Sequence, residues 1–561
     1  MGFLTRLRFK LKNVFKSNLS FDSVLSEKVS AFFAIAIFIS YSFLIFYKID
    51  EIPGIFIDEA NYMNEVISLA NFGTDIHGVE NPVYFTSVWG QGQSVLYSLF
   101  VVPFVKLFGF SVLVFRAPFV ILNLLLIGAL MWIIKNFSNS WKVTLFAEIG
   151  IVSAPWIFIS SRWILDANVA PIIFLFGLVL LAYAANIEKS SWKRKALYFF
   201  SAIFIAGTAY GYVASWIYLP IVLILFALYL LKLKRIKLSE SLIFAVTTFL
   251  VALPIVYFAY YVNVKHGLSV DKFLWFGISP LPTNRASSMI DFSTPGVFNK
   301  MMQNVIEGMK IYWFGSDGLS WNSVSPFGAI FPWLLPFTII GLFLNKEFFT
   351  NKMYVFKQLL LISVIAFIPL LLVVTPNYNH WNLINIQLAI FTGLGLYSVV
   401  NKLNPRLTLI GAVLPILLFG FFASYYYFGT NGKVTFYNSE MQQVTEVQQI
   451  NNFMKKHPRS KLFINGLAGN YMYYRIVQEP ISHDEFLKIQ DNDNPEFTKD
   501  MGKPTRYGYL YDLSTIRSES SKGDYLLVPL QESDIYINDG WKKLKMYPYA
   551  RHQYILLEKE L

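Results

Sequence analysis

The chain is dominated by uninterrupted apolar runs of about the length that crosses a membrane. Of its 561 residues, 55% are hydrophobic and only 15% are charged, whereas a soluble domain carries roughly a quarter charged residues. Because such runs recur along most of the chain, the sequence predicts a polytopic α-helical membrane protein. A secreted domain, a coiled coil and a disordered chain are excluded. The runs predicted to span are 29–47, 118–134, 143–159, 169–186, 197–213, 215–231, 242–262, 327–344, 357–374, 381–400 and 407–428.

Basic residues predict which ends of these runs face the cytoplasm. Lys and Arg collect in the N-terminal tail and in four short loops between spans, and cytoplasmic loops carry an excess of these residues. The four loops share one side only if the run 93–110 does not cross. We therefore expect 93–110 to be a juxtamembrane helix on the outer face of a plasma membrane. This gives eleven spans, a cytoplasmic N-terminus and an external C-terminus; the alternative is twelve spans with inverted loops.

This topology divides the chain into three parts. Residues 1–28 form a cytoplasmic basic tail, 29–429 a transmembrane module, and 430–561 an extracytoplasmic domain. Two external loops of the module, 48–117 and 263–326, are long, and long ordered loops are usually functional. The net charge of +12 is expected in cytoplasmic loops, so nucleic acid is not an expected partner.

The C-terminal part turns polar and has a mixed periodicity. Helical spacing of apolar residues covers Asn438–Lys456, and short buried strands are predicted at Lys461–Asn465, Asp524–Leu530 and Gln553–Leu557. We therefore expect a small α/β domain outside the membrane.

Motifs of several other enzyme classes are missing or misplaced. The chain has no cysteine, so it has no disulfide framework, thiolate metal site or cysteine nucleophile. Asp491-Asn492-Asp493 spells D-x-D, but it falls in an external polar loop, where nucleotide sugars are absent. Gly393-Leu394-Gly395 lies in an apolar run, where glycines let helices approach closely.

Two other classes remain as alternatives. A lipid or polysaccharide flippase would bury ionisable residues in its spans, and Glu148 is the clear example here. A polysaccharide polymerase also has large outer loops. A loop that carries chemistry directly after the first span would favour a transferase over both.

Two adjacent carboxylates, Asp58 and Glu59, lie some ten residues after the first run. A carboxylate at a membrane boundary is partly desolvated, which raises its pKa and makes it a better proton acceptor. The alternative is that the pair only caps a helix that begins near Ala60, since acids favour helix N-termini.

The motifs that follow this pair resemble those of the GT-C class of glycosyltransferases. After Asp58-Glu59 come Asn81-Pro82-Val83-Tyr84, Leu107-Phe108-Gly109 and Arg116-Ala117-Pro118, and later Ser161-Arg162-Trp163-Ile164-Leu165-Asp166. The likeness is closest to the branch of protein O-mannosyltransferases and the aminoarabinose transferase of lipid A. The chain departs from that branch at Ser87–Gln93, which has no acid, and its third external segment is too short for a large inserted module. The fold therefore carries over better than the substrate.

The resemblance implies a membrane enzyme that transfers a sugar from a polyprenyl-phosphate donor to an acceptor hydroxyl with inversion. Asp58 would be the base, and Arg162 would contact the donor phosphate unless it pairs with Asp166. Arg116 is interpreted as a snorkelling anchor. The acceptor is a glycan, lipid or protein; membrane lipids are the other partners. No cofactor or metal is expected, although a divalent ion is not ruled out. The residues expected to bind substrate are Glu59, His77, Arg162, Asp166, Arg285 and His380.

Overall fold

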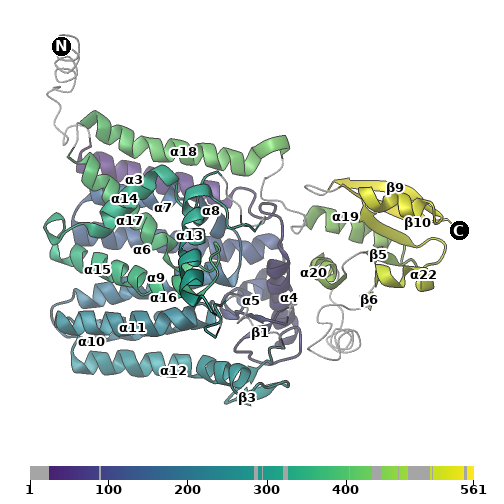
Figure 1. Ribbon diagram of the computed structural model, residues 1–561, viewed down its shortest axis with the longest axis horizontal. Coiled ribbons are helices and arrows are strands. Elements are labelled where there is room, and N and C mark those ends of the chain that lie inside the picture. The colour runs from purple at the N-terminus through teal and green to yellow at the C-terminus, as the bar shows by residue number, and fades with distance from the viewer. Residues whose placement is uncertain are drawn as a thin grey trace, which may run out of the picture.

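The structure of the protein is a computed structural model. It describes residues 25–87, 90–282, 289–293, 295–319, 322, 326–402, 405–432, 444–464, 467–477, 506–507, 509–548 and 553–560. A bundle of long helices fills one side of the molecule and a sheet lies at the other (Figure 1). Between them lie the segments that follow the first helix. We call this side of the bundle the loop end.

Eight helices in the described part of the chain are long and apolar enough to cross a membrane. The first, α3, begins after Ser26, whose hydroxyl accepts from the Val29 amide and caps the helix. The helices that supply the eight spans are α3 (Glu27–Phe46), α6 (Val112–Ser138), α9 (Asp166–Ala185), α11 (Ser215–Lys232), α12 (Leu238–Asn263), α15–α16 (Asn351–Ile365 and Ile368–Val373), α17 (Asn385–Val400) and α18 (Pro405–Gly432).

Three of the eleven predicted spans coincide with shorter helices. They correspond to α7 (Trp141–Val152) with α8 (Pro155–Ser160), to α10 (Trp192–Gly207), and to α14 (Leu335–Phe343). The first is divided because Pro155 has no amide hydrogen to continue the ladder of α7. The count of eleven therefore stays a prediction.

The run 93–110 forms a helix of 13 residues, α5 (Leu96–Phe108). At 1.5 Å per residue it is about 20 Å long, which is less than the roughly 30 Å of a bilayer core. This length supports the interpretation of a juxtamembrane helix.

Glycines bring α17 into direct backbone contact with two neighbours. A Cβ on Gly393 would overlap the carbonyl of Phe146 in α7, and a Cβ on Gly395 would overlap that of Phe337 in α14. Gly150 and Gly341 make the reciprocal contacts from α7 and α14. The interpretation of the Gly393–Gly395 motif as a helix-packing motif is thus confirmed.

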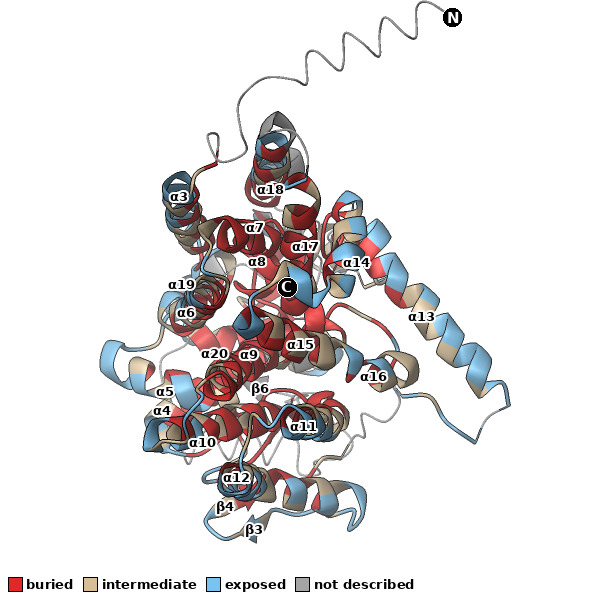
Figure 2. Ribbon diagram, turned by 90° about the vertical axis from the view of Figure 1, so that its left-hand side faces the viewer, coloured by how far each residue is buried: buried red, intermediate tan, exposed pale blue. Residues whose placement is uncertain are grey.

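Short elements cover the loop end. Helix α4 (Ile57–Phe72) follows α3, and a hairpin of β1 (Phe85–Thr86) and β2 (Gly92–Gln93) follows α4. A second hairpin, β3 (Asp271–Phe273) and β4 (Phe276–Ile278), comes after α12. The third external segment continues into α13 (Val297–Phe314), which lies across the bundle when the spanning helices are seen end-on (Figure 2).

The C-terminal part forms a mixed six-stranded sheet in the order β6-β7-β5-β8-β10-β9. Strand β5 runs parallel to β7 and β8, whereas β10 pairs antiparallel with β8 and β9. The predicted strands at 461–465, 524–530 and 553–557 are confirmed. The elements are α19 (Val444–Lys455), β5 (Leu462–Ile464), α20 (Leu467–Val477), β6 (Arg506–Tyr507), β7 (Leu510–Asp512), α22 (Ile516–Glu519), β8 (Tyr525–Pro529), α23 (Ser533–Ile537), β9 (Trp541–Pro548) and β10 (Gln553–Lys559).

Side-chain alternation buries both faces of the central strands. On one face, Phe463, Leu526 and Ile555 form a small separate core. On the other, Leu462 and Leu527 join the large core that extends through the bundle. The sheet is therefore packed on the loop end and is not a tethered, independent module.

Candidate active site

Helix α4 places the two adjacent acids in different environments. Asp58 and Glu59 both lie in its first turn, where a negative charge is favoured by the helix dipole. Asp58 is half-buried, whereas the Glu59 side chain is fully buried. Neighbouring residues on a helix point about 100° apart, so one acid turns towards the core and the other stays accessible.

Glu59 is held by Arg116 of α6 in a bidentate ion pair. The guanidinium donates from Nε to Oε1 at 2.8 Å and from Nη2 to Oε2 at 2.5 Å, and both side chains have no exposed surface. Burial raises the pKa of Glu59 and Arg116 opposes this rise. Because both oxygens accept from the guanidinium, the carboxylate is ionised.

This geometry changes two predictions. The interpretation of Arg116 as a snorkelling anchor is wrong, because its charged end is buried and also donates to the carbonyls of Ile49 and Pro53, each at 2.9 Å. Glu59 was predicted to bind substrate. Because its carboxylate is fully buried, the structure does not present Glu59 to a substrate.

Arg162, which lies between α8 and α9, anchors the same segment. Its guanidinium is fully buried and donates to main-chain carbonyls at the end of α3 and in the loop after it, including Tyr47 and Ile52, both at 2.8 Å. The rings of Phe158 and Tyr427 lie 5.5 and 5.0 Å from it. Because no edge of the guanidinium is exposed, neither the phosphate contact nor the pair with Asp166 is supported.

Two buried arginines therefore fix the stretch between α3 and α4. Arg116 takes carbonyls at 49 and 53, and Arg162 takes carbonyls at 44, 45, 47 and 52. Hydrogen bonds from a charged donor contribute about 1.5–3 kcal/mol each. The start of α4, and with it Asp58, is thus held rigidly on the bundle.

Gln93 of β2 completes the support of Asp58. Its Nε2 donates to the Asp58 carbonyl at 2.9 Å, and its Oε1 accepts from the Asn61 side chain. The preceding Gly92 is required because a Cβ there would lie 2.7 Å from the Tyr84 ring. The motif that ends in Gln93 was noticed in the sequence, but its role was missed, since nothing local points to Asp58.

Asp166 and His380 reach the loop end near α4. Asp166 is the first residue of α9. The residues just before it are joined to α4, because the Ile164 amide donates to the Glu59 carboxylate at 3.3 Å. The Asn382 side chain donates to the Ala167 carbonyl at 3.0 Å, which places the segment of His380 beside Asp166. The structure thus brings Asp58, Asp166 and His380 to one end of the bundle.

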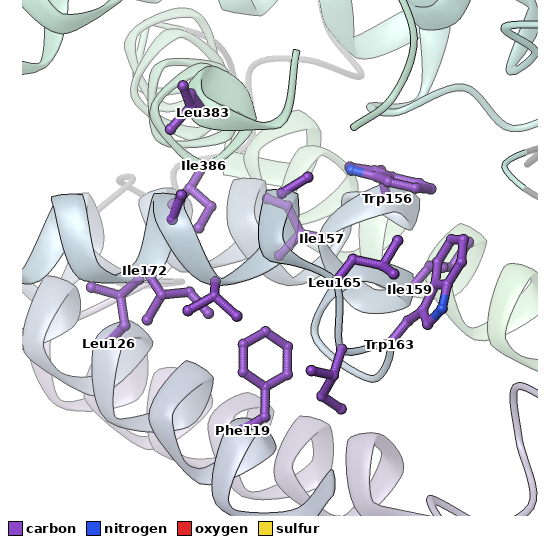
Figure 3. Packing of buried hydrophobic residues seen from close by; sticks show 14 of the residues in the cluster. Phe119, Leu126, Trp156, Ile157, Ile159, Trp163, Leu165, Ile172, Leu383 and Ile386 are labelled. Carbon is purple, nitrogen blue, oxygen red and sulfur yellow. The ribbon is translucent and has the colours of Figure 1, made fainter. Parts of the chain in front are cut away.

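A packed apolar layer lies beneath these residues. Side chains from α6, α8, α9 and the start of α17 meet there, as Figure 3 shows for Phe119, Trp156, Trp163, Ile172 and Leu383. The layer keeps the polar residues of the loop end out of the apolar interior of the bundle.

His77 lies at the other end of α4, beside the C-terminal domain. Its Nε2 is 3.2 Å from the Thr86 carbonyl, and burial lowers its pKa to about 4. Fourteen residues, roughly 21 Å along the helix axis, separate Phe72 at this end of α4 from Asp58.

A buried acidic pair lies beside the second half of α4, which we call its far end. Glu65 accepts from the Ile76 amide at 3.0 Å, and Asp75 accepts from the amides of His77 and Val79 at 2.9 and 2.8 Å. Burial raises the pKa of Asp75 to about 7. Burial and the charge of Asp75 raise that of Glu65, while Arg475 of α20 lowers it. Sequence reasoning missed this cluster because its cation, Arg475, lies 410 positions from Glu65 in the chain.

Two further points concern the predicted site. Arg285 lies outside the described residues. Within the described residues, no group of three or more His, Cys, Asp or Glu side chains could hold a metal ion.

A spanning bundle with a helical segment after its first span and a terminal sheet is similar to the fold of a solved GT-C glycosyltransferase. ArnT from Cupriavidus metallidurans, an aminoarabinose transferase, has this fold. Its structure bound to undecaprenyl phosphate matches 93% of this chain and 97% of its own, with a TM-score of 0.56 and 12% identity. Its apo structure matches with a TM-score of 0.55.

A more distant likeness is to the Archaeoglobus fulgidus oligosaccharyltransferase, with a TM-score of 0.43 at 12% identity over 92% of this chain and 72% of that one. No protein-family model matches the sequence, and no curated relative matches it. At this level of identity the likeness shows the fold.

Proposed function

We propose that the protein is a membrane glycosyltransferase that moves a sugar from a polyprenyl-phosphate donor to an acceptor hydroxyl. Asp58 is the catalytic base. The observation that carries the proposal is the half-buried Asp58, held at a helix N-terminus by Gln93 and two buried arginines, in a chain with the fold of ArnT. The ArnT structure bound to undecaprenyl phosphate supports a donor of the same lipid class.

The reaction is a single inverting displacement. The acceptor oxygen bonds to the anomeric carbon while the bond from that carbon to the donor phosphate oxygen breaks. The acceptor proton passes to the Asp58 carboxylate, and polyprenyl phosphate leaves with the bonding electron pair. A general base contributes about 10²–10⁴ in rate. Asp166, His380 and Arg285 are proposed to contact donor or acceptor, with Arg285 the cationic candidate for the leaving phosphate.

The membrane orientation follows from the basic loops. We propose that the N-terminus is cytoplasmic and that the loop end, with the domain 430–561, faces outward. Protease added to intact cells should then cleave within 430–561 and leave the N-terminal tail intact. Protection of 430–561 from outside would contradict this orientation.

The test of the proposed function is release of polyprenyl phosphate from purified protein incubated with polyprenyl-phosphate sugars and candidate acceptors. Asp58→Asn keeps the shape of the side chain and removes the proton acceptor, so turnover should fall about 10²–10⁴-fold. Glu80→Gln, an exposed acid in the same loop, is the matched control and should retain activity. Full turnover by Asp58→Asn would move the base elsewhere.

A further inference from the structure

Helix α13 has three faces of different character. Its buried face carries Gly308, Ile311 and Tyr312. At about 100° per residue, a second face gathers large apolar side chains that remain exposed, by 39–70% of their surface. These residues, which we call the apolar stripe, are Phe298, Met302, Ile306, Met309 and Trp313.

The third face is polar and also exposed. Asn299, Lys300, Gln303 and Lys310 lie there, and Lys310 pairs with Glu307 at 2.7 Å. On a helical wheel, one direction points straight away from the bundle, opposite the buried face. The apolar stripe lies on one side of this direction and the polar face on the other, each roughly 120–130° from the buried face. A helix docked on the side of a bundle with this division has one flank suited to lipid and the other to water.

The direction of α13 fits the same division. In Figure 2 the spanning helices are seen end-on while α13 is seen along its length, so it runs across them. A helix across the spans lies parallel to the membrane plane. Amphipathic helices that lie in this plane bury their apolar face in the boundary between headgroups and acyl chains.

The apolar stripe continues a surface that must face lipid. The Asn304 side chain donates to the Leu372 carbonyl of α16 at 2.9 Å, so α13 lies against the candidate span 351–373. Ile365 and Ile368 of that span are 46% and 48% exposed. An exposed apolar patch that extends a lipid-facing surface is most simply covered by lipid.

The buried face of α13 contacts the segment of His380. The Tyr312 hydroxyl donates to the Asn385 side chain at 2.6 Å, and the Tyr378 hydroxyl donates to the Ile311 carbonyl at 3.1 Å. A Cβ on Gly308 would overlap the Trp381 ring. Any depth at which α13 is held is therefore transmitted to residues 378–385.

We propose that α13 is an interfacial helix whose apolar stripe is embedded in the acyl chains of the leaflet at the loop end, and that it sets the level of the 378–385 segment relative to the membrane surface. The occupant of the apolar stripe is membrane lipid. The link to residues 378–385 rests on the proposed transferase function, whereas the position of α13 does not.

The absence of cysteine from the chain makes the position directly testable. Single variants Met302→Cys and Ile306→Cys on the apolar stripe, and Gln303→Cys on the polar face, are spin-labelled in phosphatidylethanolamine–phosphatidylglycerol vesicles. Labels on the apolar stripe should relax with dissolved oxygen and be shielded from a water-soluble nickel chelate, and the label at 303 should do the reverse. Stripe labels that are open to the chelate, or shielded from both reagents by protein, would overturn the proposal.

A kinetic comparison tests the link to the site. The double variant Met302→Glu with Ile306→Glu should raise the KM for a long-chain lipid donor about tenfold or more, since charged side chains are costly among acyl chains and would displace α13 and the 378–385 segment. Gln303→Glu should leave it unchanged. An unchanged KM in the double variant would overturn the link. If the unaltered protein shows no transfer at all, the proposed function fails while the labelling result stands.

Discussion

The buried carboxylates at the two ends of α4 are compensated in different ways. At the near end, one carboxylate, Glu59, meets one guanidinium, Arg116, with every oxygen satisfied. At the far end, Glu65 and Asp75 are both fully buried, and the charge of one cation, Arg475, acts on Glu65. An equal pair stays ionised, whereas two acids beside one cation favour the uptake of a proton. The near end is therefore a fixed anchor and the far end is titratable.

Breaking the near end should have the largest effect. Arg116→Met leaves the Glu59 charge buried without a partner, and such losses cost about 3–5 kcal/mol. We expect a large drop in thermal stability of the purified protein in detergent. Combining Arg116→Met with Glu59→Gln should recover much of it, because the uncompensated charge is gone. A double variant that is worse than Arg116→Met by itself would contradict the assignment of the pair.

Breaking the far end should cost less and depend on pH. Arg475→Met should destabilise the protein by about 1–3 kcal/mol at pH 8 and by less at pH 5, because the raised pKa values of Glu65 and Asp75 leave the pair more protonated at the lower pH. The measurement is thermal unfolding at the two pH values. Arg517→Met, at an exposed arginine of α22, is the control. Equal losses at both pH values would mean that the two ends of α4 do not differ.

The sign of the pH dependence at the far end follows from its raised pKa. Asp75 titrates near 7 in the folded protein and near 3.8 when unfolded, so its contribution is present below about 4 and is lost as pH rises through 7. His77, with its pKa lowered from 6.5 to about 4, contributes stability above 6.5 that is lost as pH falls through 4. Asp75→Asn should therefore raise the Tm at pH 8 relative to pH 5, by about 1 °C per kcal/mol removed in a chain of 561 residues. If Asp75→Asn leaves the difference in Tm between pH 8 and pH 5 unchanged, the group that binds the proton is not Asp75.

Chelation should have the smallest effect, namely none. If a proton, and not a metal cation, compensates the negative charge of Glu65 and Asp75, EDTA leaves the Tm unchanged at any pH. We also propose that transfer is metal-independent, because an arginine or lysine can neutralise a monophosphate leaving group. Turnover lost in EDTA and restored by Mg²⁺ or Mn²⁺ would recast Asp58 as a metal ligand. A Tm lowered by EDTA would instead place a cation between Glu65 and Asp75.

Local patterns predicted much of the fold. The apolar run 29–47 became α3, and the three strands of the C-terminal part were placed within a few residues, because both follow from periodicity and breaker residues along the chain. The acidic pair at Asp58 was found because its spacing from the first span is a local feature. The helix that carries it begins at Ile57, slightly earlier than expected.

The partners of the charged residues could not be predicted in this way. Arg116 lies 57 positions from Glu59, and Arg475 lies 410 positions from Glu65. Such pairs depend on how helices pack in three dimensions. The one available signal was energetic: an arginine beside apolar residues at a membrane boundary is costly without a partner. That signal gives the presence of a partner and leaves its identity open.

The glycine contacts of α17 determine where this molecule is able to deform. Side chains act as a compliant layer between most helices, since they exchange rotamers when the helices shift. Between α7, α17 and α14 that layer is missing at Gly150, Gly393, Gly341 and Gly395, so the three helices form one stiff plate. We therefore expect that any shift of one helix against another is concentrated outside these three helices, which keep their positions relative to one another.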